Sequence, residues 1–539
     1  MPDVSNSLRT VLGSPRRRIV LALASLVILQ ASVCFPASSG LPGVGNYDTA
    51  YYYAVARNLA DGRGSIDTVL WHFLGPPESV VRPIGDYWPP GWPFLLAALM
   101  RVFGHSMTAA IGICATLSLL LPVLVFWLAY LVRGQTWLAW LAGVLVIFQN
   151  SLHQTNVTPD VSLPYALVTL LGLCAFMEHR RRRAPDKWLI LVGAAMTLPF
   201  WLRGEGFIPF GAITLTVLLS GDITWRRRAV RIGWLLLGSA CCQLPLWLYN
   251  LLAFGAMTPE PRTMVLFFTD IPTDLYTFGS NPSFTTWWDQ GLPTILDNIG
   301  DRLYENAFAF FKQNPWALGG LAVVGMIRKV NCEPRFTTTL PLTMFVVLSW
   351  LVPAVLVPNG ASADRLILNT TPIQCILAVL AFDGLVRGRY RPPVLLLLGT
   401  LFLFACTVVS WPLRIENPLD LKWQSRFGPI PAHLLPDGRP ALGPDDLVLT
   451  RDPWQVAALL DVRAVMVPFD GPLAMRDVID HYRPRYLLAR RGSDVDRNRV
   501  SLDSLSHRPV AQAGPRSLAR AAVGRLTAIH STNEPILDA

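Results

Sequence analysis

The chain has 539 residues, of which 52% are hydrophobic and only 15% are charged. Soluble domains carry about a quarter charged residues, so this composition excludes a purely soluble protein and indicates a polytopic membrane protein with some soluble mass. The formal net charge of +10 comes from short basic clusters between apolar runs. Such clusters are typical of loops that set membrane topology, and we therefore expect no nucleic-acid partner.

The eight cysteines fall mostly inside apolar runs, and none has the spacing of a CxxC motif or of a Cys/His zinc site. We interpret them as small buried apolar residues. Arg16, Arg17 and Arg18 precede an apolar run from Ile19 to about Pro36. This run is longer than the core of a signal peptide, so we expect it to be the first transmembrane helix.

Windows of about 20 mostly apolar residues predict about eleven spanning helices. If the N-terminus is cytoplasmic, every strong basic cluster falls on one side of the membrane, as the positive-inside rule requires. The long segments 37–105, 255–313 and 413–539 then lie on the outer face, which predicts a bacterial inner-membrane protein with a periplasmic working surface. The expected spans lie near residues 19–36, 107–132, 136–152, 160–178, 187–202, 206–220, 231–254, 315–328, 338–357, 366–386 and 393–412.

The first outer loop begins with residues 47–59, in which tyrosine, alanine and leucine side chains share one face at a helical period. This pattern predicts an amphipathic helix in the membrane interface. Asp48 stands at its start, where free N–H groups favour a carboxylate, and helix capping is its simpler interpretation. The loop ends in an aromatic turn at residues 87–93, which we expect to anchor the chain at the headgroup level.

Hydropathy falls after about Trp411, and residues 446–492 alternate strand-like with helix-like runs. This alternation predicts a small C-terminal α/β domain, so we expect a membrane domain over 1–412 and an outer domain over 413–539. The segment has no GxGxxG fingerprint, and we assign it no nucleotide. We expect it to shape or cover a site in the membrane domain.

Ionisable groups at membrane depth, or at the end of a spanning helix, are costly and mark candidate sites. Asp48, Asp160, the pair Arg203 and Glu205, and Arg365 are expected on the outer side. Each has a simpler interpretation: capping for the aspartates, a local ion pair, and interfacial snorkelling for Arg365. Together they suit a lipid-linked phosphate donor and a hydroxyl nucleophile, because arginine binds phosphate and a carboxylate accepts a proton.

His72 and His153 could join a carboxylate in holding a divalent metal, although ordinary hydrogen bonding is their simpler interpretation. The chain has no HExxH motif, no Gly-Lys-Ser/Thr phosphate loop and no GxSxG elbow. The absence of the last two argues against ATP-driven transport and against a serine hydrolase.

Several motifs carry a family resemblance. The first loop opens with Asp48, then Tyr-Tyr and Ala-Arg-Asn-Leu-Ala-Asp-Gly-Arg-Gly, and closes with Tyr-Trp-Pro-Pro-Gly-Trp-Pro. Thr-Pro-Asp-Val follows at 158–161, an Arg-x-Glu-Gly element at 201–206, and Asp-Arg-Leu-Ile-Leu at 364–368. Their order resembles the GT-C superfamily of membrane glycosyltransferases, in particular the bacterial branch related to protein O-mannosyltransferases and aminoarabinose lipid A transferases.

The resemblance implies a GT-C-like α-helical membrane domain with a large first outer loop and interfacial helices. It also implies transfer of a hexose or pentose from a polyprenyl-phosphate donor to a glycan, lipid or protein acceptor on the outer face, inverting at the anomeric carbon. Asp48 would be the base, and a divalent metal is an optional cofactor. The hypothesis assigns substrate binding to Asp160, Arg203, Glu205, Arg365, Tyr52 and Tyr87.

The chain departs from the family pattern at two positions. Asp48 is followed by Thr49 where many relatives have Glu, and position 366 is Leu where Tyr is common. Two other functions are alternatives: a transporter or flippase of a lipid-linked glycan, and a non-catalytic membrane scaffold. A transporter predicts inverted repeats or helices broken near the midplane, and the sequence shows no paired halves.

Overall fold

The computed structural model of the chain describes residues 14–39, 41, 47–221, 223–312, 316–332, 339–359, 363–386, 399 and 442–488. The described chain is mostly helical and divides into two compact units. Unit 1 comprises Met1–Gly40, Ile111–Tyr249 and Leu296–Ile415, and unit 2 comprises Leu41–Ala110, Asn250–Ile295 and Glu416–Ala539. Unit 2 therefore gathers most of the three long segments that the sequence analysis assigns to the outer face.

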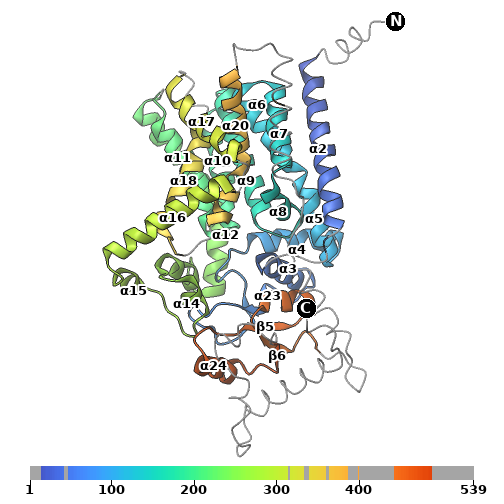
Figure 1. The fold of residues 1–539 in the computed structure, drawn as a ribbon, viewed down its shortest axis with the longest axis vertical. Coiled ribbons are helices and arrows are strands. Elements are labelled where there is room, and N and C mark those ends of the chain that lie inside the picture. The colour runs from blue at the N-terminus through green and yellow to red at the C-terminus, as the bar shows by residue number, and fades with distance from the viewer. Residues whose placement is uncertain are drawn as a thin grey trace, which may run out of the picture. The chain divides into compact units, whose positions relative to one another are not determined.

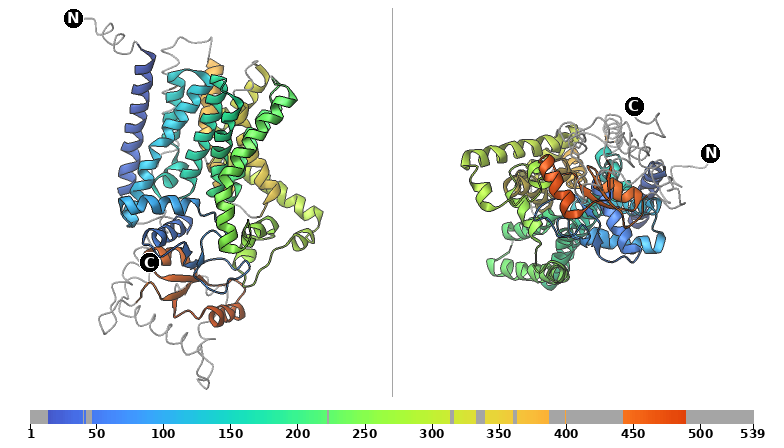
Figure 2. Two further views of the ribbon diagram at one scale, coloured as in Figure 1. Left: turned by 180° about the vertical axis from the view of Figure 1, so that it is seen from behind. Right: turned by 90° about the horizontal axis from the view of Figure 1, so that it is seen from below.

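Unit 1 is a bundle of mostly apolar helices, and most of them run side by side when seen from the front and from behind (Figure 1, Figure 2). Three of them, α5, α12 and α16, have one end in unit 2. The helices are α2 (Pro15–Ser39), α5 (Met107–Ser118), α6 (Leu120–Arg133), α7 (Thr136–Ile147), α8 (Asn150–Val157), α9 (Ser162–Arg182), α10 (Leu189–Thr197), α11 (Phe207–Leu219), α12 (Trp225–Phe254), α16 (Leu292–Lys312), α17 (Trp316–Cys332), α18 (Leu340–Leu356), α19 (Ala363–Leu368) and α20 (Thr371–Val386).

The apolar runs of the sequence coincide with these helices. Each of the first ten expected spans overlaps a helix, and the span expected at 393–412 lies almost wholly outside the described residues. Among the described residues, four helical segments are long and apolar enough to cross a membrane: α2, α5 with α6, α9 and α12. Shorter apolar helices include α7, α18 and α20. The exact number of spans stays a prediction.

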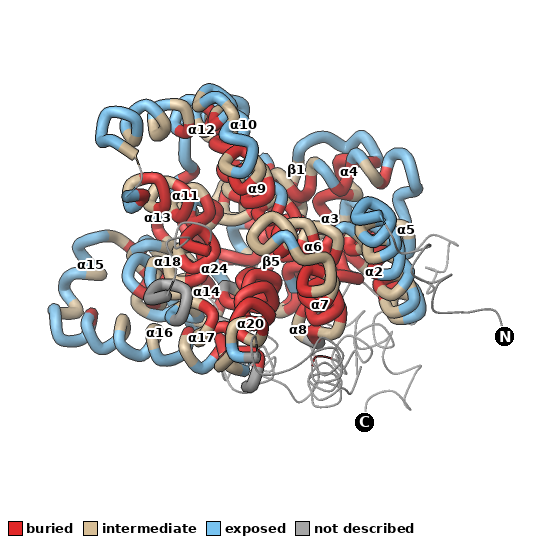
Figure 3. Tube along the Cα trace, turned by 90° about the horizontal axis from the view of Figure 1, so that it is seen from above, coloured by how far each residue is buried: buried red, intermediate tan, exposed pale blue. Residues whose placement is uncertain are grey.

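Burial separates the core of the bundle from its periphery (Figure 3). In α9, 78% of the most apolar window is buried, against 17% in α2 and 28% in α12. The last two helices expose large aliphatic side chains such as Ile28 and Leu252. Because a water-facing surface rarely exposes so many apolar groups, α2 and α12 suit contact with lipid.

Unit 2 is built from the first loop, the second loop and the C-terminal segment. Its first two helices, α3 and α4, pack against each other, and α3 also packs against α23. The elements are α3 (Tyr47–Ala60), β1 (Ile66–Asp67), β2 (Val69–Leu70), β3 (Arg82–Pro83), α4 (Gly91–Phe103), α13 (Glu260–Met264), α14 (Ile271–Tyr276), α15 (Phe284–Trp288), β4 (Leu447–Thr450), α23 (Pro453–Leu460), β5 (Arg463–Met466), α24 (Pro472–Tyr482) and β6 (Tyr486–Leu488).

The strands β2, β5, β4 and β6 form one parallel sheet in that order. The strands and helices expected within 446–492 are present, with bounds that differ by one or two residues. The short β2 was not expected: Val69 and Leu70 lie opposite Ala464 and Val465 of β5. The first loop thus supplies an edge strand to the sheet of the C-terminal segment. The domain boundary proposed near residue 412 lies outside the described residues.

Helix α3 differs from the expectation of an amphipathic interfacial helix. Every residue from Asp48 to Ala60 except Arg57 is buried. An interfacial helix would keep one polar face in water, so the expectation of a solvated face is wrong. The physical reason is tertiary packing, because α4 and α23 cover sides of α3 that the local pattern assigns to solvent.

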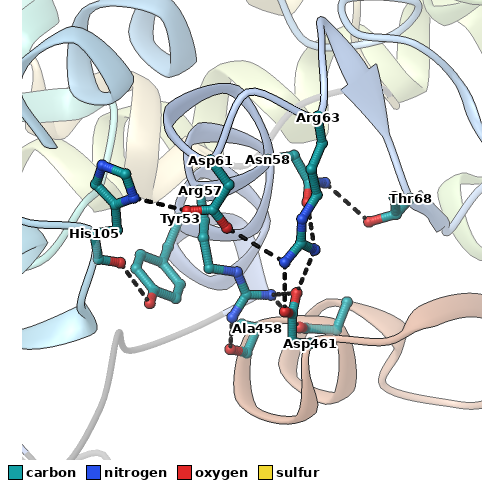
Figure 4. A network of polar contacts seen from close by, with 10 residues as sticks. Tyr53, Arg57, Asn58, Asp61, Arg63, Thr68, His105, Ala458 and Asp461 are labelled. Atoms are coloured by element: carbon teal, nitrogen blue, oxygen red, sulfur yellow. Dashed lines mark hydrogen bonds and ion pairs between the residues drawn. The ribbon is translucent and has the colours of Figure 1, made fainter. Parts of the chain in front are cut away.

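The C-terminal end of α23 is capped by α3 (Figure 4). The guanidinium of Arg57 donates to the carbonyl oxygens of Ala457 at 2.9 Å and Ala458 at 3.1 Å, and it pairs with Asp461 at 2.7 Å. Arg63 forms a second ion pair with Asp461, also at 2.7 Å. A cation at the last carbonyls of a helix satisfies acceptors that have no partner within the helix and opposes the negative end of the helix dipole.

We expect Arg57→Ala to lower the apparent melting temperature of the purified protein by several degrees. Hydrogen bonds from a charged donor contribute about 1.5–3 kcal/mol, and truncation removes two of them together with a half-buried ion pair. Differential scanning fluorimetry in detergent measures the change. The matched control is Arg63→Ala, whose more exposed ion pair contributes about 0–1 kcal/mol. Equal melting of the Arg57 variant and the wild type would contradict the capping role.

Candidate functional site

The two ends of the unit 1 bundle can be told apart by an ion pair between its helices. Arg133, the last residue of α6, pairs with Asp383 in the last turn of α20 at 3.1 Å. α7 begins at this end and runs to the opposite end, where α9 begins after the short α8. α9 runs back toward the Arg133 end, and α10 then returns to the opposite end. α20 must also begin there, directly after α19. We call this opposite end the polar end of unit 1.

Four of the sequence-predicted site residues lie at the polar end: Asp160, Arg203, Glu205 and Arg365. Asp160 immediately precedes α9 and is buried. Its carboxylate accepts a hydrogen bond from the backbone N–H of Ser162 at 2.6 Å. This hydrogen bond fixes the turn that leads into α9, whose N-cap is Val161.

Arg203 and Glu205 form an ion pair beside a pair of short 3₁₀ turns, Leu198–Trp201 and Gly204–Gly206. A Cβ atom added at Gly206 would lie 2.1 Å from the backbone nitrogen of Phe200. Only glycine fits this close backbone approach, which explains the Gly of the Arg-x-Glu-Gly element. Tyr165, in the first turn of α9, lies within electrostatic range of both charged groups.

Two further residues occupy the polar end. Arg365 lies on the short helix α19 and is half-buried. His153 lies on α8 and is buried, and neither of its ring nitrogens has a hydrogen-bond partner among the described residues. Burial lowers the pKa of His153, so the imidazole is held neutral.

The other three predicted site residues, Asp48, Tyr52 and Tyr87, belong to unit 2. Asp48 lies in the first turn of α3 and is only 8% exposed. Tyr52 follows one turn later, with its ring 5.8 Å from that of Trp88. Tyr87 lies 5.6 Å from Trp88 and 4.7 Å from Trp71. The aromatic turn expected at a lipid surface thus packs its Tyr87 and Trp88 rings into an aromatic cluster beside α3.

Sequence reasoning missed a group of buried charges, which we call the loop ion cluster: Asp67, His72, Arg82 and Asp86. The antiparallel pairing of β1 with β3 sets Asp67 opposite Arg82, and the two side chains form an ion pair at 3.1 Å. The Nε of Arg82 donates to Asp86, which also lies 3.3 Å from His72. The one available signal was Arg82 itself, a charge between the apolar residues Val80, Val81 and Ile84.

The loop ion cluster perturbs the protonation of its members. Complete burial raises the pKa of Asp67 to about 7, although Arg82 opposes the shift. Burial also acts against ionisation of Asp86, but Arg82 and His72 outweigh it and hold the pKa of Asp86 well below its usual range. Burial lowers the pKa of His72 despite the nearby Asp86. The cluster therefore contains a buried carboxyl group, that of Asp67, whose pKa lies near neutral pH.

Comparison with solved structures identifies the fold. AglB, the archaeal oligosaccharyltransferase from Archaeoglobus fulgidus, in complex with an inhibitory peptide and a dolichol-phosphate, matches with a TM-score of 0.57 at 12% identity, covering 87% of this chain and 69% of that chain. ArnT from Cupriavidus metallidurans bound to undecaprenyl phosphate matches with a TM-score of 0.50 at 12% identity, covering 86% of this chain and 88% of that chain. No protein-family model and no curated protein matches the sequence.

Both solved structures are GT-C membrane glycosyltransferases, and this chain has the GT-C fold. The resemblance inferred from the motifs is thus confirmed at the level of the fold. A further structure of the archaeal oligosaccharyltransferase, in complex with Zn and sulfate, has a TM-score of 0.55 at 13% identity, covering 86% of this chain and 67% of that chain.

The metal expectation was compared with the donor groups of this chain. Among the described residues, no three His, Cys, Asp or Glu side chains gather into a metal-binding group. His72 instead contacts Asp86 inside the loop ion cluster, and His153 lies in the other unit. A divalent metal therefore stays an expectation, and the proposed chemistry below does not depend on one.

We expect Asp67→Asn to change how stability depends on pH. The unfolded carboxyl loses its proton near pH 3.8 and the folded one near pH 7, so ionisation opposes folding increasingly from about pH 4 to 7. The melting temperature of the wild type relative to the Asn variant should therefore fall by a few degrees between pH 5 and 7.5. Scanning fluorimetry across that range measures it.

Asp86→Asn provides the contrasting control. Its lowered folded-state pKa stabilises the fold above the unfolded value, so this substitution should destabilise the protein throughout pH 5–8. A difference between the wild type and the Asp67 variant that is independent of pH would show that Asp67 does not titrate in the folded protein.

Proposed function

We propose that this protein is a membrane glycosyltransferase that moves a hexose or pentose from a polyprenyl-phosphate-linked donor to a hydroxyl acceptor on the outer face of the membrane. The observation that carries the proposal is the GT-C fold, shared over most of the chain with solved structures that hold a dolichol-phosphate and an undecaprenyl phosphate. The acceptor is a glycan, a lipid or a protein. The host membrane is a bacterial inner membrane, with unit 2 in the periplasm.

The proposed base is Asp48. Its carboxylate is buried in the first turn of α3, next to the aromatic cluster that includes Tyr52 and Tyr87. A carboxylate is a general base of the kind that can accept a proton from a bound hydroxyl. The aromatic rings supply broad apolar surfaces against which the substrates can pack.

The donor phosphate is proposed to bind at the polar end of unit 1. Arg203 and Arg365 are two of the cations at that end, and a guanidinium can hold two phosphate oxygens at once. Glu205 and Asp160 orient the site through the Arg203 ion pair and the start of α9. The exposed apolar faces of α2 and α12 suit the lipid environment through which a polyprenyl chain would enter.

The proposed reaction is a single displacement. The acceptor oxygen attacks the anomeric carbon from the face opposite the phosphate and gives its proton to Asp48. The bond between the anomeric carbon and the phosphate oxygen breaks, and its electron pair leaves with the polyprenyl phosphate. Since this leaving group is a weak base, it needs charge stabilisation by arginine more than protonation. The configuration at the anomeric carbon is inverted.

We expect Asp48→Asn to lower transfer by about 100-fold or more, because general base catalysis contributes about 10²–10⁴-fold. The assay is complementation of a strain from which the gene is deleted, with mass spectrometry of cell-envelope glycans and of accumulated polyprenyl-linked sugars. The control is Asp61→Asn, the same chemical change just beyond the end of α3. Restoration of the glycans by the Asp48 variant would refute the base assignment.

A second expectation tests the proposed phosphate contact. If Arg203 binds the donor phosphate, Arg203→Gln should weaken binding of undecaprenyl phosphate by about 10-fold, while Glu205→Gln should preserve or strengthen it because the guanidinium is released from its carboxylate. Native mass spectrometry of the purified protein with added undecaprenyl phosphate measures both. Equal weakening in the two variants would mean that the pair is only structural.

A further inference from the structure

The parallel sheet of unit 2 brings the first loop and the C-terminal segment to one edge. β2 and β4 run in the same direction, so their carboxyl ends lie on the same side of the sheet. Trp71 directly follows β2, and Trp454 opens α23 soon after β4. Their ring centroids are 5.7 Å apart. Two tryptophans from distant parts of the sequence thus meet at the carboxyl edge of the sheet.

Trp454 also reaches the turn that carries Asp48. Its ring lies 5.0 Å from that of Tyr47, the residue before Asp48. Trp454 is only 4% exposed, whereas Tyr47 is 42% exposed. The buried indole is therefore a fixed anchor, and the tyrosine that it holds lies at the surface. The indole N–H of Trp454 has no hydrogen-bond partner among the described residues, so packing rather than hydrogen bonding holds the ring.

The opposite end of α3 is tied to the same helix. Arg57, near the end of α3, donates to Ala457 and Ala458 near the end of α23. The N-terminal ends of the two helices meet through Tyr47 and Trp454, and their C-terminal ends meet through Arg57. α23 therefore lies parallel to α3 and is fastened to it at both ends, with the packed surface between them.

Aromatic residues from later in the first loop also pack against the first turns of α3. Trp88 stacks on Trp71 at 4.3 Å and contacts Tyr51 at 4.7 Å. Trp71 is thus shared between this group of rings and Trp454. Movement of α23 along α3 would displace the whole aromatic cluster, because one tryptophan joins its two halves.

We propose that α23 is an integral part of the catalytic unit and that Trp454 is a positioning residue for Asp48. This inference rests on the proposed function, in which Asp48 is the base. The C-terminal segment then does more than cover a site. It supplies the rigid surface against which the first turn of α3 is set, and a displacement of about 1 Å at a catalytic group can lower turnover about 100-fold.

The test measures kcat and KM for Trp454→Ala and Trp454→Phe, with polyprenyl-linked sugar extracted from the deletion strain as the donor. We expect the Ala variant to lower kcat by 10- to 100-fold with a change in KM of less than about 3-fold. The Phe variant keeps a ring against Tyr47 and should recover most of the loss. The matched control is Tyr482→Ala, a buried aromatic of the same segment whose ring contacts Phe278 and whose hydroxyl donates to the carbonyl of Pro77.

Tyr47→Ala keeps the test decisive if Trp454→Ala does not fold, because Tyr47 is partly exposed and its truncation should be tolerated. It should lower kcat in the same way, and combining it with Trp454→Phe should cost less than the sum of the two effects. Wild-type kcat in the Tyr47 and Trp454 variants, together with an inactive Asp48→Asn, would overturn the positioning role and leave the proposed function standing. Full activity of Asp48→Asn would instead overturn the assignment of Asp48 as the base, whereas absence of any transfer by the wild type would overturn the proposed function.

Discussion

The pairing of a two-residue strand with the C-terminal sheet is the contact on which unit 2 depends. The N–H of Ala464 donates to the carbonyl of Thr68 at 3.0 Å, in register with the β2 to β5 pairing. Parallel pairing joins segments that are far apart in sequence. Here most of the helices of unit 1 lie between β2 and β5 along the chain. Without this pairing, Trp71 and Trp454 would have no common edge on which to meet. The position of α3 follows from that edge.

The second loop strengthens the same arrangement through backbone hydrogen bonds. Phe73 of the first loop donates to Leu275 at 2.8 Å, and Phe469 of the C-terminal segment donates to Tyr276 at 2.9 Å. Consecutive residues of the second loop therefore bind the two other segments. Each loop alone is too short in regular structure to bury a core, so the three segments depend on one another for burial.

The sequence predicts the elements well and their partners poorly. Apolar runs mark the bundle helices because a spanning helix needs a long apolar surface. The mostly apolar runs at 447–450 and 464–467 predict strands because turn residues bound them, and the structure has strands at 447–450 and 463–466. β2 escaped prediction since two residues carry no period. α3 was expected to lie in the interface because the local periodicity of a sequence does not show that a distant helix, α23, packs against it. Among the candidate site residues, Asp160, Arg203, Glu205 and Arg365 lie at one end of the bundle, and their role stays a prediction. The loop ion cluster depends on strand register that no local pattern encodes.

The loop ion cluster shows why the first loop must be rigid. Two carboxylates face one guanidinium and a neutral imidazole, so full ionisation would leave one excess negative charge in a buried site. Such a charge is tolerated only when its partners are held at hydrogen-bonding distance. The cluster is connected to α3 through Tyr51, which interacts with Asp67, and to the aromatic turn through the Tyr87 N–H that donates to Asp86. A loop that separated these partners would expose unpaired charges to an apolar interior, so electrostatics and aromatic packing favour the same fixed conformation around Asp48.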